Sequence, residues 1–552
     1  MNVQTNNKEP RRIIDGSLCD ARTFRMHVPW TLWRSFLFML IAFLVELSAS
    51  AQDRPNIIII VADDLGWNDL GYHGSEIRTP TLDSLAREGV ELNRFYAHPT
   101  CSPTRSALVT GKSPLRLGFL SPLAKNNRLG LPLSESTIAD HFRWNGYQTI
   151  LIGKWHLGRF SNEYLPNSRG FDHFYGYLTG GVGHYDHVHG GGLDWQRNGA
   201  TIREEGYTTD LLTNEAIRII QRHDPMKPFF IELSYAAPHM PNEAPMEAVE
   251  EYGHLQDENR QLHAAMVSEI DRGVKRIFET LSEQELLDRT IVWFLSDNGG
   301  ECAEAYLETT RQRFDQLTKI FGEPLPLEAL EFVRHNMANS ASDNEPLKGG
   351  KGTAFEGGVR VPSLIYAPQY LPAGRVDERI TVNDVLPTLA AATRLTGLDS
   401  SAMDGVNQWG FLSGNAQHVS ADFIVHGTNG QEAYYRDHFK LILGKGDELQ
   451  LFDLMKDPFE TNNVASHHPE LVQELTQKLV DFPRGESVHD PIWKALLDMD
   501  RFGGEEDRPP WAEVEGVNAG PVHPLYFILP VLLLSVFASI WTVRRRRKRR
   551  EP

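Results

Sequence analysis

The chain has 552 residues, of which 41% are hydrophobic and 23% charged, a composition typical of a globular protein with one large domain and a smaller one. Its formal net charge of -18 argues against nucleic acid as a partner, because a surface that binds nucleic acid has to be basic. Because the chain is acidic, an anionic substrate would have to be attracted locally, by a metal ion or by Lys, Arg and His side chains. The three cysteines, Cys19, Cys101 and Cys302, are too few for a fold built on disulfides.

The first segment has the features of an export signal. An apolar run at 36–45 is followed by Ala49-Ser50-Ala51, a small-x-small cleavage pattern. We therefore expect residues 1–51 to be an N-terminal extension with a signal peptide. An uncleaved anchor is the alternative, although the run is short for a membrane span.

The last segment predicts a membrane anchor. A linker rich in Gly, Pro and acidic residues at 501–523 leads into an apolar stretch at 524–543, which is long enough to cross a bilayer. A basic tail at 544–552 follows, and the positive-inside rule would keep it in the cytoplasm. The sequence thus predicts an exported protein anchored by a single C-terminal span, with its body outside the cytoplasm. A removable sorting tail is the alternative.

Between the two ends, short apolar strands alternate with helices. The predicted strands lie at 54–62, 147–152, 228–235 and 290–296, and the predicted helices at 80–88, 136–144 and 261–281. This alternation indicates an α/β domain, at 52–415, with a large mixed and mostly parallel sheet flanked by helices. Hairpin-like strands at 434–443 and 448–453 and a helix at 468–480 predict a smaller C-terminal α+β subdomain at 416–500.

Polar side chains directly follow several of these strands. They are Asp63, Asp64, His156, His239, Asp297 and Asn298. Ligands of parallel sheets bind beyond the carboxyl ends of the strands, so we expect these side chains to share one site. Oxygen-only donors favour Ca²⁺ or Mg²⁺ over zinc, and the pairs Asp63-Asp64 and Asp297-Asn298 therefore predict a hard-cation site. Turn and capping chemistry is the alternative for either pair alone.

The start of a helix at Cys101-Ser102-Pro103-Thr104-Arg105 is the feature around which the other candidates gather. Pro103 suits the first helical turn, and Ser102 can cap it. Arg105 lies one helical turn further, so its guanidinium group can reach back to the side chain of residue 101. Backbone N–H groups, the helix dipole and a guanidinium would then surround one side chain, which suits a tetrahedral oxyanion. An ordinary helix start with a buried cysteine is the alternative.

Four more basic side chains are candidates for binding an anion. Lys154 and His156 lie on one short loop, and His239 follows another strand. Lys351 lies among glycines that let the backbone approach a ligand. Taken singly, each has a plainer explanation as a structural histidine or a solvated lysine.

Together these motifs resemble the sulfatase family of the alkaline-phosphatase superfamily. Residues 100–111 are similar to its first signature, 146–156 to its second, and Lys351 with 356–360 to a third block; 451–460 resembles its C-terminal motif. The resemblance implies an alkaline-phosphatase-like fold. It also implies an arylsulfatase-like sulfuric ester hydrolase that acts on sulfated carbohydrates or aryl sulfates.

The resemblance further implies that a formylglycine-generating or maturase enzyme oxidises Cys101 to formylglycine. One hydroxyl of the hydrated aldehyde would attack sulfur, and the second would be deprotonated to release sulfate from the resulting ester. Ca²⁺, or alternatively Mg²⁺, would be held by Asp63, Asp64, Cys101, Asp297 and Asn298.

The same resemblance gives the remaining residues their expected roles. Arg105 and Lys154 would orient the nucleophile and stabilise negative charge. His156 would be the base for elimination. His239 and Lys351 would bind the sulfate and protonate the leaving oxygen.

Two other functions fit these residues. A phosphate or phosphonate ester hydrolase could use the same scaffold, because sulfate and phosphate have similar shapes. An inactive, surface-displayed glycan-binding protein is the alternative of another class, although the complete catalytic set argues against it. Two segments depart from the family pattern: an insertion at 301–345, and a Gly- and His-rich segment at 180–190. We expect the latter to be a loop at the rim of the pocket; a sugar-sulfate subsite, a second metal site and a plain surface loop are its alternatives.

Overall fold

The structure is a computed structural model that describes residues 54–125, 127–189, 192–301, 341–428, 430–444 and 448–489. The predicted signal peptide, linker, span and tail lie outside the described residues, as does most of the predicted insertion. The predicted domain boundaries at 52, 415 and 500 stay predictions.

The membrane-anchored location predicted from the sequence has to be corrected. Among the described helices, none is both long enough and apolar enough to cross a bilayer. The longest, α8 (Glu258–Glu283), has 26 residues but is amphipathic, with charged side chains along its exposed face. The stretch at 524–543, on which the prediction depended, is not among the described residues.

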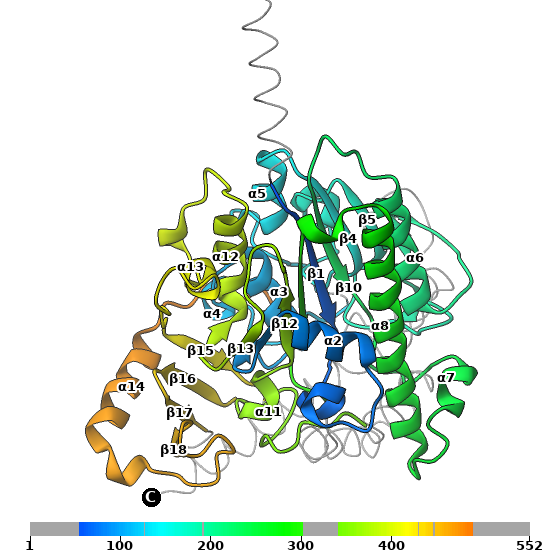
Figure 1. The fold of residues 1–552 in the computed structure, drawn as a ribbon. Helices are drawn as coiled ribbons and strands as arrows, with labels where there is room; N and C mark the ends of the chain where they lie inside the picture. The colour runs from blue at the N-terminus through cyan, green and yellow to red at the C-terminus, as the bar shows by residue number, and fades with distance from the viewer. Residues whose placement is uncertain are drawn as a thin grey trace, which may run out of the picture. The chain divides into compact units, whose positions relative to one another are not determined.

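A sheet of ten strands forms the centre of the described part, in the order β13-β2-β12-β11-β1-β10-β4-β5-β8-β9 (Figure 1). Its middle is parallel and consists of β11 (Thr290–Ser296), β1 (Asn56–Ala62), β10 (Phe229–Ser234), β4 (Gln148–Lys154) and β5 (His173–Tyr177). One side continues with β12 (Ser363–Tyr366), β2 (Val90–Leu92) and β13 (Gly374–Val376), the other with β8 (Gln196–Arg197) and β9 (Ala200–Thr201). The predicted mixed, mostly parallel sheet is confirmed.

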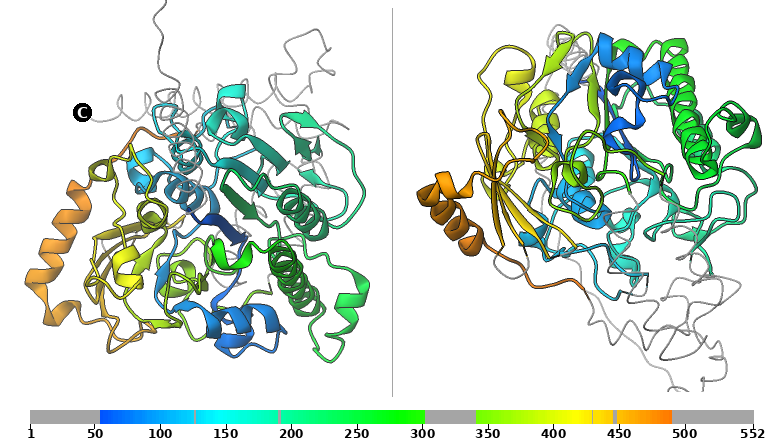
Figure 2. Two further views of the ribbon diagram at one scale, coloured as in Figure 1. Left: turned by 45° about the horizontal axis from the view of Figure 1, so that its top comes forward. Right: turned by 90° about the horizontal axis from the view of Figure 1, so that it is seen from below.

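The central strands are apolar on both faces because helices cover both. In β1, Ile57 and Ile59 face one core, and Ile58 and Ile60 face the other. Figure 2 shows the covering helices on either side of the sheet. The first core is closed by α3 (Cys101–Thr110), α5 (Ile138–Trp144) and α12 (Val385–Ala392), and the second by α2 (Pro80–Glu88), α6 (Thr208–Gln221) and α8.

The C-terminal part is a four-stranded antiparallel sheet with one helix. Its strands are β15 (Phe423–His426), β16 (Glu432–Arg436), β17 (Phe439–Leu443) and β18 (Leu449–Asp453), and α14 (Pro469–Asp481) packs on β16 and β17. The fully buried Lys440 of β17 links this part to Glu356, the first residue of α11 (Glu356–Val359). Its Nζ lies 3.1 Å from Glu356 Oε1 and 2.7 Å from Glu460 Oε1. Glu460 also accepts a hydrogen bond from the backbone N–H of Glu356 at 2.7 Å, so Lys440 and Glu460 together join the two parts.

Replacing Lys440 with methionine should destabilise the fold strongly. The change leaves two buried carboxylates without their shared cation, which costs about 3–5 kcal/mol of the free energy of unfolding. Urea denaturation measures this loss. Lys456→Met is the matched control, because Lys456 is 84% exposed and its bond to Asp453 is worth at most about 1 kcal/mol. Equal stability of the two variants would contradict the structural role of Lys440.

Candidate active site

Two turns at the carboxyl edge of the sheet bring the acidic residues together. Ala62 pairs with Ser296 in the parallel ladder, so the residues after β1 and β11 emerge side by side. The backbone N–H of Asp64 donates to Asp297 Oδ1 at 3.3 Å, and Asn298 Nδ2 donates to Asp64 Oδ1 at 2.8 Å. Asp64 has a φ of 69°, a strained backbone for a residue other than glycine, as is frequent at functional sites.

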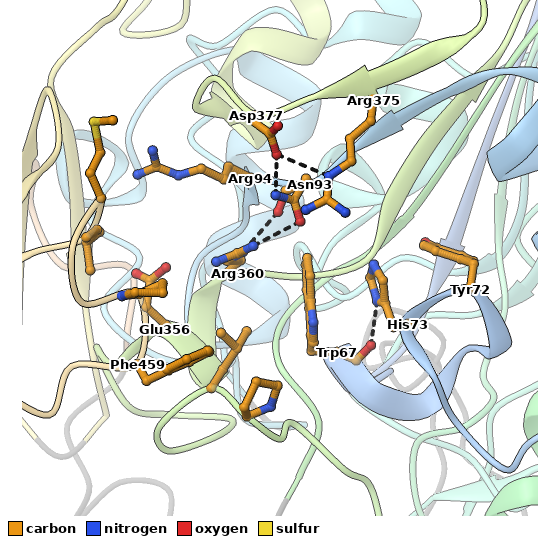
Figure 3. Close-up of a pocket in the computed structure, with 15 residues that line it drawn as sticks. Trp67, Tyr72, His73, Asn93, Arg94, Glu356, Arg360, Arg375, Asp377 and Phe459 are labelled. Atoms are coloured by element: carbon orange, nitrogen blue, oxygen red, sulfur yellow. Dashed lines mark hydrogen bonds and ion pairs between the residues drawn. The ribbon is translucent and has the colours of Figure 1, made fainter.

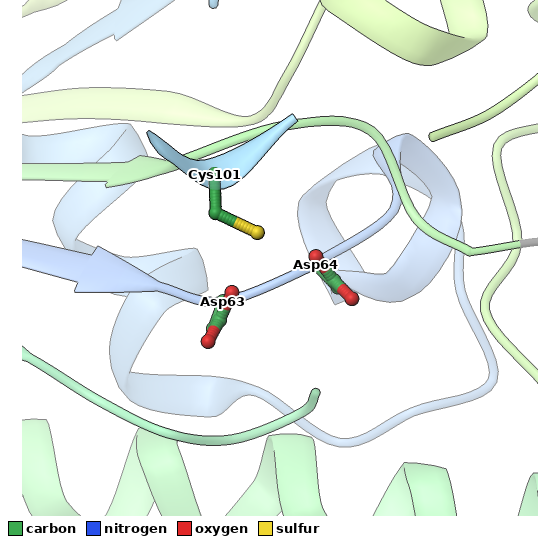
Figure 4. A group of neighbouring side chains, drawn as sticks. All are labelled: Asp63, Asp64 and Cys101. Carbon is green, nitrogen blue, oxygen red and sulfur yellow. The ribbon is translucent and has the colours of Figure 1, made fainter. Parts of the chain in front are cut away.

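Cys101 faces this acidic turn from the first residue of α3. Its Sγ and one carboxylate oxygen each of Asp63 and Asp64 lie within 4.8 Å of one another (Figure 4). The side chain is buried, and burial raises the pKa of the thiol to about 12, although Lys154 and Lys351 oppose the shift. An unmodified Cys101 would therefore be protonated and weakly nucleophilic at neutral pH.

The acidic side fits a divalent cation. Burial, reinforced by Asp297 and Asp64, raises the pKa of Asp63 to about 8 even though Lys154 contacts it. The Oδ1 atom of Asn298 is buried and has no hydrogen-bond partner among the residues that the structure describes. A cation bound between these oxygens would relieve the carboxylate repulsion and satisfy the orphaned amide oxygen. Oxygen donors of this kind suit Ca²⁺ or Mg²⁺.

Basic groups close the site from the other side. Arg105 donates from Nε and Nη2 to Asp297 Oδ2 at 3.0 and 2.8 Å, and from Nη1 to the Lys154 carbonyl oxygen at 3.0 Å. Lys154 Nζ donates to both carboxylate oxygens of Asp63, at 2.6 and 2.9 Å. Because both cations are fully buried against carboxylates, their positions are fixed before a substrate arrives.

Lys351 and His239 approach the same oxygen of Asp64. Lys351 Nζ donates to Oδ2 at 2.5 Å, and His239 Nε2 lies 3.6 Å from it. His239 Nδ1 lies 2.7 Å from the carbonyl oxygen of Met240 and so carries a proton. Burial lowers the pKa of His239 well below its usual range, although Asp64 opposes the shift.

His156 is held as a neutral imidazole with one free nitrogen. Its Nε2 donates to the carbonyl oxygen of Leu123 at 2.9 Å, which assigns the tautomer. The buried Nδ1 has no hydrogen-bond partner in the described part of the chain. Burial, with Lys154 next in effect, lowers the pKa of His156 well below its usual range. The ring therefore presents an unprotonated nitrogen that can accept a proton.

The structure brings all the predicted site residues together at this edge, and two further ones that the sequence analysis missed. Ser234, the last residue of β10, accepts a hydrogen bond from Arg105 Nη1. Glu301 is buried near Lys351, and burial raises its pKa to about 7. Only their positions in the sequence could have identified them, since Ser234 is the last residue of a strand and Glu301 follows the turn at Asp297. A single serine or glutamate is too common in any sequence to indicate a functional site.

The Gly- and His-rich segment lies against the two catalytic histidine candidates. A Cβ added to Gly180 would come within 2.7 Å of His156 Cε1, and one on Gly181 within 2.9 Å of His239 Cε1. The buried His184 Nε2 lies 3.0 Å from the His239 carbonyl oxygen, and its Nδ1 lies 2.7 Å from Thr208 Oγ1. His184 thus fastens the loop, which leaves neither of its nitrogens for a second metal.

A methyl group at Gly180 should lower activity without unfolding the protein. Gly180→Ala would push the His156 ring away, and a displacement of about 1 Å costs about 10²-fold in kcat/KM. Turnover of 4-nitrophenyl sulfate and the thermal midpoint measure the two effects. Gly374→Ala is the control, since nothing lies within 4 Å of the added Cβ. Unchanged kcat/KM in Gly180→Ala would show that the ring is not held by this contact.

An α/β sheet with a candidate cation site and fixed basic groups around Cys101 suits a hydrolase for esters of tetrahedral oxyanions. Comparison with known proteins narrows this class. The chain belongs to the sulfatase family, whose model, described as Sulfatase, matches residues 55–395. It is therefore a sulfuric ester hydrolase.

Individual relatives agree with this assignment. Arylsulfatase J of Mus musculus is 29% identical over 496 residues, which cover 79% of this chain and 77% of that protein. N-acetylgalactosamine-6-sulfatase of Homo sapiens is 31% identical over 383 residues, covering 65% and 66%. The crystal structure of Ps i-CgsB in complex with k-i-k-neocarrahexaose is 29% identical, with a TM-score of 0.69, and covers 80% of this chain and 96% of that one. The predicted fold class is confirmed.

Proposed function

We propose that this enzyme removes sulfate from sulfated saccharides, with residue 101 as the nucleophile position. One observation carries the proposal: Cys101 lies at the start of α3 with carboxylates on one side and buried basic groups on the other. A sulfate ester bound there would meet positive charge around its oxygens and a cation site beside the attacking atom. The acidic body would not repel it, because the local charges dominate at this distance.

The state of the thiol supports a modification of Cys101. A thiol with a pKa of about 12 supplies almost no thiolate at neutral pH, so the unmodified side chain is a poor nucleophile. Conversion to formylglycine by a formylglycine-generating or maturase enzyme would replace it with a hydrated aldehyde, whose hydroxyls need no thiolate. Ca²⁺ held by Asp63, Asp64, Asp297, Asn298 and residue 101 would supply Lewis-acid stabilisation of negative charge.

The chain's own groups fit the proton transfers. His156 Nδ1 is unprotonated and would accept the proton that has to leave during sulfate release. Lys351 Nζ would donate to a sulfate oxygen, and His239, once protonated at the Nε2 that faces the site, would pass that proton to the leaving alcohol. Arg105 and Lys154 would keep the acidic ligands in place during both steps.

The saccharide substrate class is inferred from the relatives. Human N-acetylgalactosamine-6-sulfatase carries a sulfated amino sugar in its name, and Ps i-CgsB was crystallised with a neocarrahexaose. The two relatives differ in sugar, so the proposal extends to sulfated saccharides as a class.

Sulfate release from defined sulfated mono- and oligosaccharides, measured by ion chromatography, tests the substrate class. The protein should be produced together with a formylglycine-generating enzyme, and mass spectrometry of the peptide containing residue 101 should show the aldehyde. Aryl phosphate should be turned over far more slowly than aryl sulfate. Turnover of aryl sulfate without release from any sulfated saccharide would refute the proposed substrate class.

A further inference from the structure

A second cavity, of about 540 Å³, lies between the main sheet's edge strands and the turn after β18 (Figure 3). Three arginines, Arg94, Arg360 and Arg375, line it together with Trp67, Asp377 and Phe459. The mechanism above uses none of them. The cavity therefore needs an explanation of its own.

The strand directions place this cavity on the same edge as the catalytic site. Strand β12 is antiparallel to both β11 and β2, so β2 runs in the direction of β11. Arg94 follows the end of β2, just as Asp297 follows the end of β11. Two strand spacings separate β2 from β11, which corresponds to about 10 Å along the edge. Trp67, three residues after Asp64, connects the two places along the chain.

Two of the arginines form no close ion pair, and Glu356 acts on both only at longer range. Arg360 donates from Nε and Nη2 to the Asn93 carbonyl and side-chain oxygens at 2.9 and 3.0 Å, and its guanidinium carbon lies 4.5 Å from the centre of the Trp67 ring. Arg94 has a buried Nη2 with no hydrogen-bond partner among the described residues. No described carboxylate comes within 4.0 Å of either guanidinium group to form an ion pair.

The acidic residues of the cavity already have partners. Asp377 accepts hydrogen bonds from Arg375 Nε at 3.1 Å and from Asn93 Nδ2 at 2.5 Å. Glu356 accepts from Lys440 and Tyr96, at 3.1 and 2.8 Å. Glu356 is thus shared with Lys440, so the three arginines of the cavity outnumber its two carboxylates, Glu356 and Asp377. In a chain with a formal net charge of -18, such a cavity is a local attractor for an anion.

The rim suits a sugar. Phe459 is 43% exposed and Met455 is 74% exposed, and both belong to the cavity lining. An exposed aromatic face beside charged donors is a surface on which an apolar sugar face can pack while its anionic substituent meets the guanidinium groups. A lone inorganic ion would leave this apolar rim unused.

We propose that this cavity is a second anion-binding subsite, which holds a sulfate or carboxylate group of the same glycan chain whose scissile sulfate lies at residue 101. This inference rests on the proposed saccharide substrate. It predicts that long anionic glycans gain affinity from all three arginines, of which Arg94 and the more exposed Arg375 are the ones to replace, whereas small aryl sulfates do not reach them. The ends of β2 and β11 are about 10 Å apart along the sheet edge, a distance that a few sugar rings can bridge.

The test measures binding and turnover separately. Fluorescence anisotropy of a labelled heparin octasaccharide gives the Kd for wild type, Arg94→Gln and Arg375→Gln, and 4-nitrophenyl sulfate gives kcat/KM. Each variant should raise the Kd about ten-fold, the typical loss of a charge-assisted contact, and leave aryl sulfate turnover within two-fold. Arg375 is more than half exposed, so its variant should fold even if Arg94→Gln does not. Arg87→Gln, on the exposed side of α2, is the control for removing one positive charge.

Equal octasaccharide affinity in wild type, both variants and the control would overturn the subsite. Equal losses in binding and in aryl sulfate turnover would also overturn it, because they would show a general structural effect. An octasaccharide without sulfate groups but with its carboxylates distinguishes the two anions: a Kd that still depends on Arg94 or Arg375 identifies the carboxylate. If these variants lose affinity but the wild type releases sulfate from no saccharide, the substrate class fails while the subsite stands.

Discussion

Replacing Cys101 with alanine is expected to abolish sulfate release, with kcat falling by at least about 10⁴-fold, as happens when a covalent enzyme loses its nucleophile. The basic groups and the cation site would still bind the ester, so KM should change much less. The substitution removes one buried sulfur atom, and the thermal midpoint should fall by only a few degrees. Steady-state turnover of 4-nitrophenyl sulfate and a melting curve measure the two quantities.

Cys101→Ser is the matched variant that tests the modified side chain. Serine keeps one hydroxyl at the start of α3 but lacks the second hydroxyl of a hydrated aldehyde. It should therefore release at most about one equivalent of 4-nitrophenol per protein and then stall. Full sulfate release by Cys101→Ala would show that residue 101 is not the nucleophile. Sustained turnover by Cys101→Ser would show that the second hydroxyl is not needed.

The centre of the fold could be predicted well from the sequence, because the polar side chains of the candidate site directly follow the apolar central strands. The apolar runs before Asp63 and Asp297 had to be buried parallel strands, and their polar successors had to meet at one edge. The ladder in which Ala62 pairs with Ser296 produces this meeting directly. That Cys101 lies at the same edge could be predicted only from the resemblance to the family. The sequence of α3 does not show how this helix is oriented relative to the sheet.

The edges of the sheet and the supporting contacts could not be predicted in the same way. Strands β2 and β13 have three residues each, too few for a pattern of alternating burial to stand out. The link from Lys440 to Glu356 and Glu460 joins positions that are 84 and 20 residues apart. Sequence spacing carries no information about such a contact, although the acidic end of the C-terminal motif was visible. That Arg94 and Arg360 meet in one cavity without a close ion pair is equally invisible without coordinates.

Removing divalent cations with a chelator is expected to lower turnover by at least about 100-fold and to reduce the thermal midpoint, and Ca²⁺ should restore both. The physical reason is the packing of three buried carboxylates and an orphaned amide oxygen at one edge. A cation at 100 times its Kd contributes about 2.7 kcal/mol to the free energy of unfolding. Asn298→Ala, which removes the orphaned oxygen, should weaken Ca²⁺ binding in calorimetry. If neither the turnover rate nor the thermal midpoint changes on addition of chelator or Ca²⁺, the proposed cation is wrong.

The cation-free protein should also respond to pH in a specific direction. Its Asp63 has a pKa of about 8 when folded, against 3.8 for an ordinary aspartate, so between these values the folded state holds a proton that the unfolded chain releases. Stability must then fall as pH rises from about 4 to about 8, because the folded state binds the extra proton. Ca²⁺ would displace that proton and flatten the slope. Chelated Asp63→Asn protein, which has no proton to lose at this position, should show a shallower fall than chelated wild type in urea titrations at pH 5 and pH 8; equal slopes would mean that Asp63 is ionised without the cation.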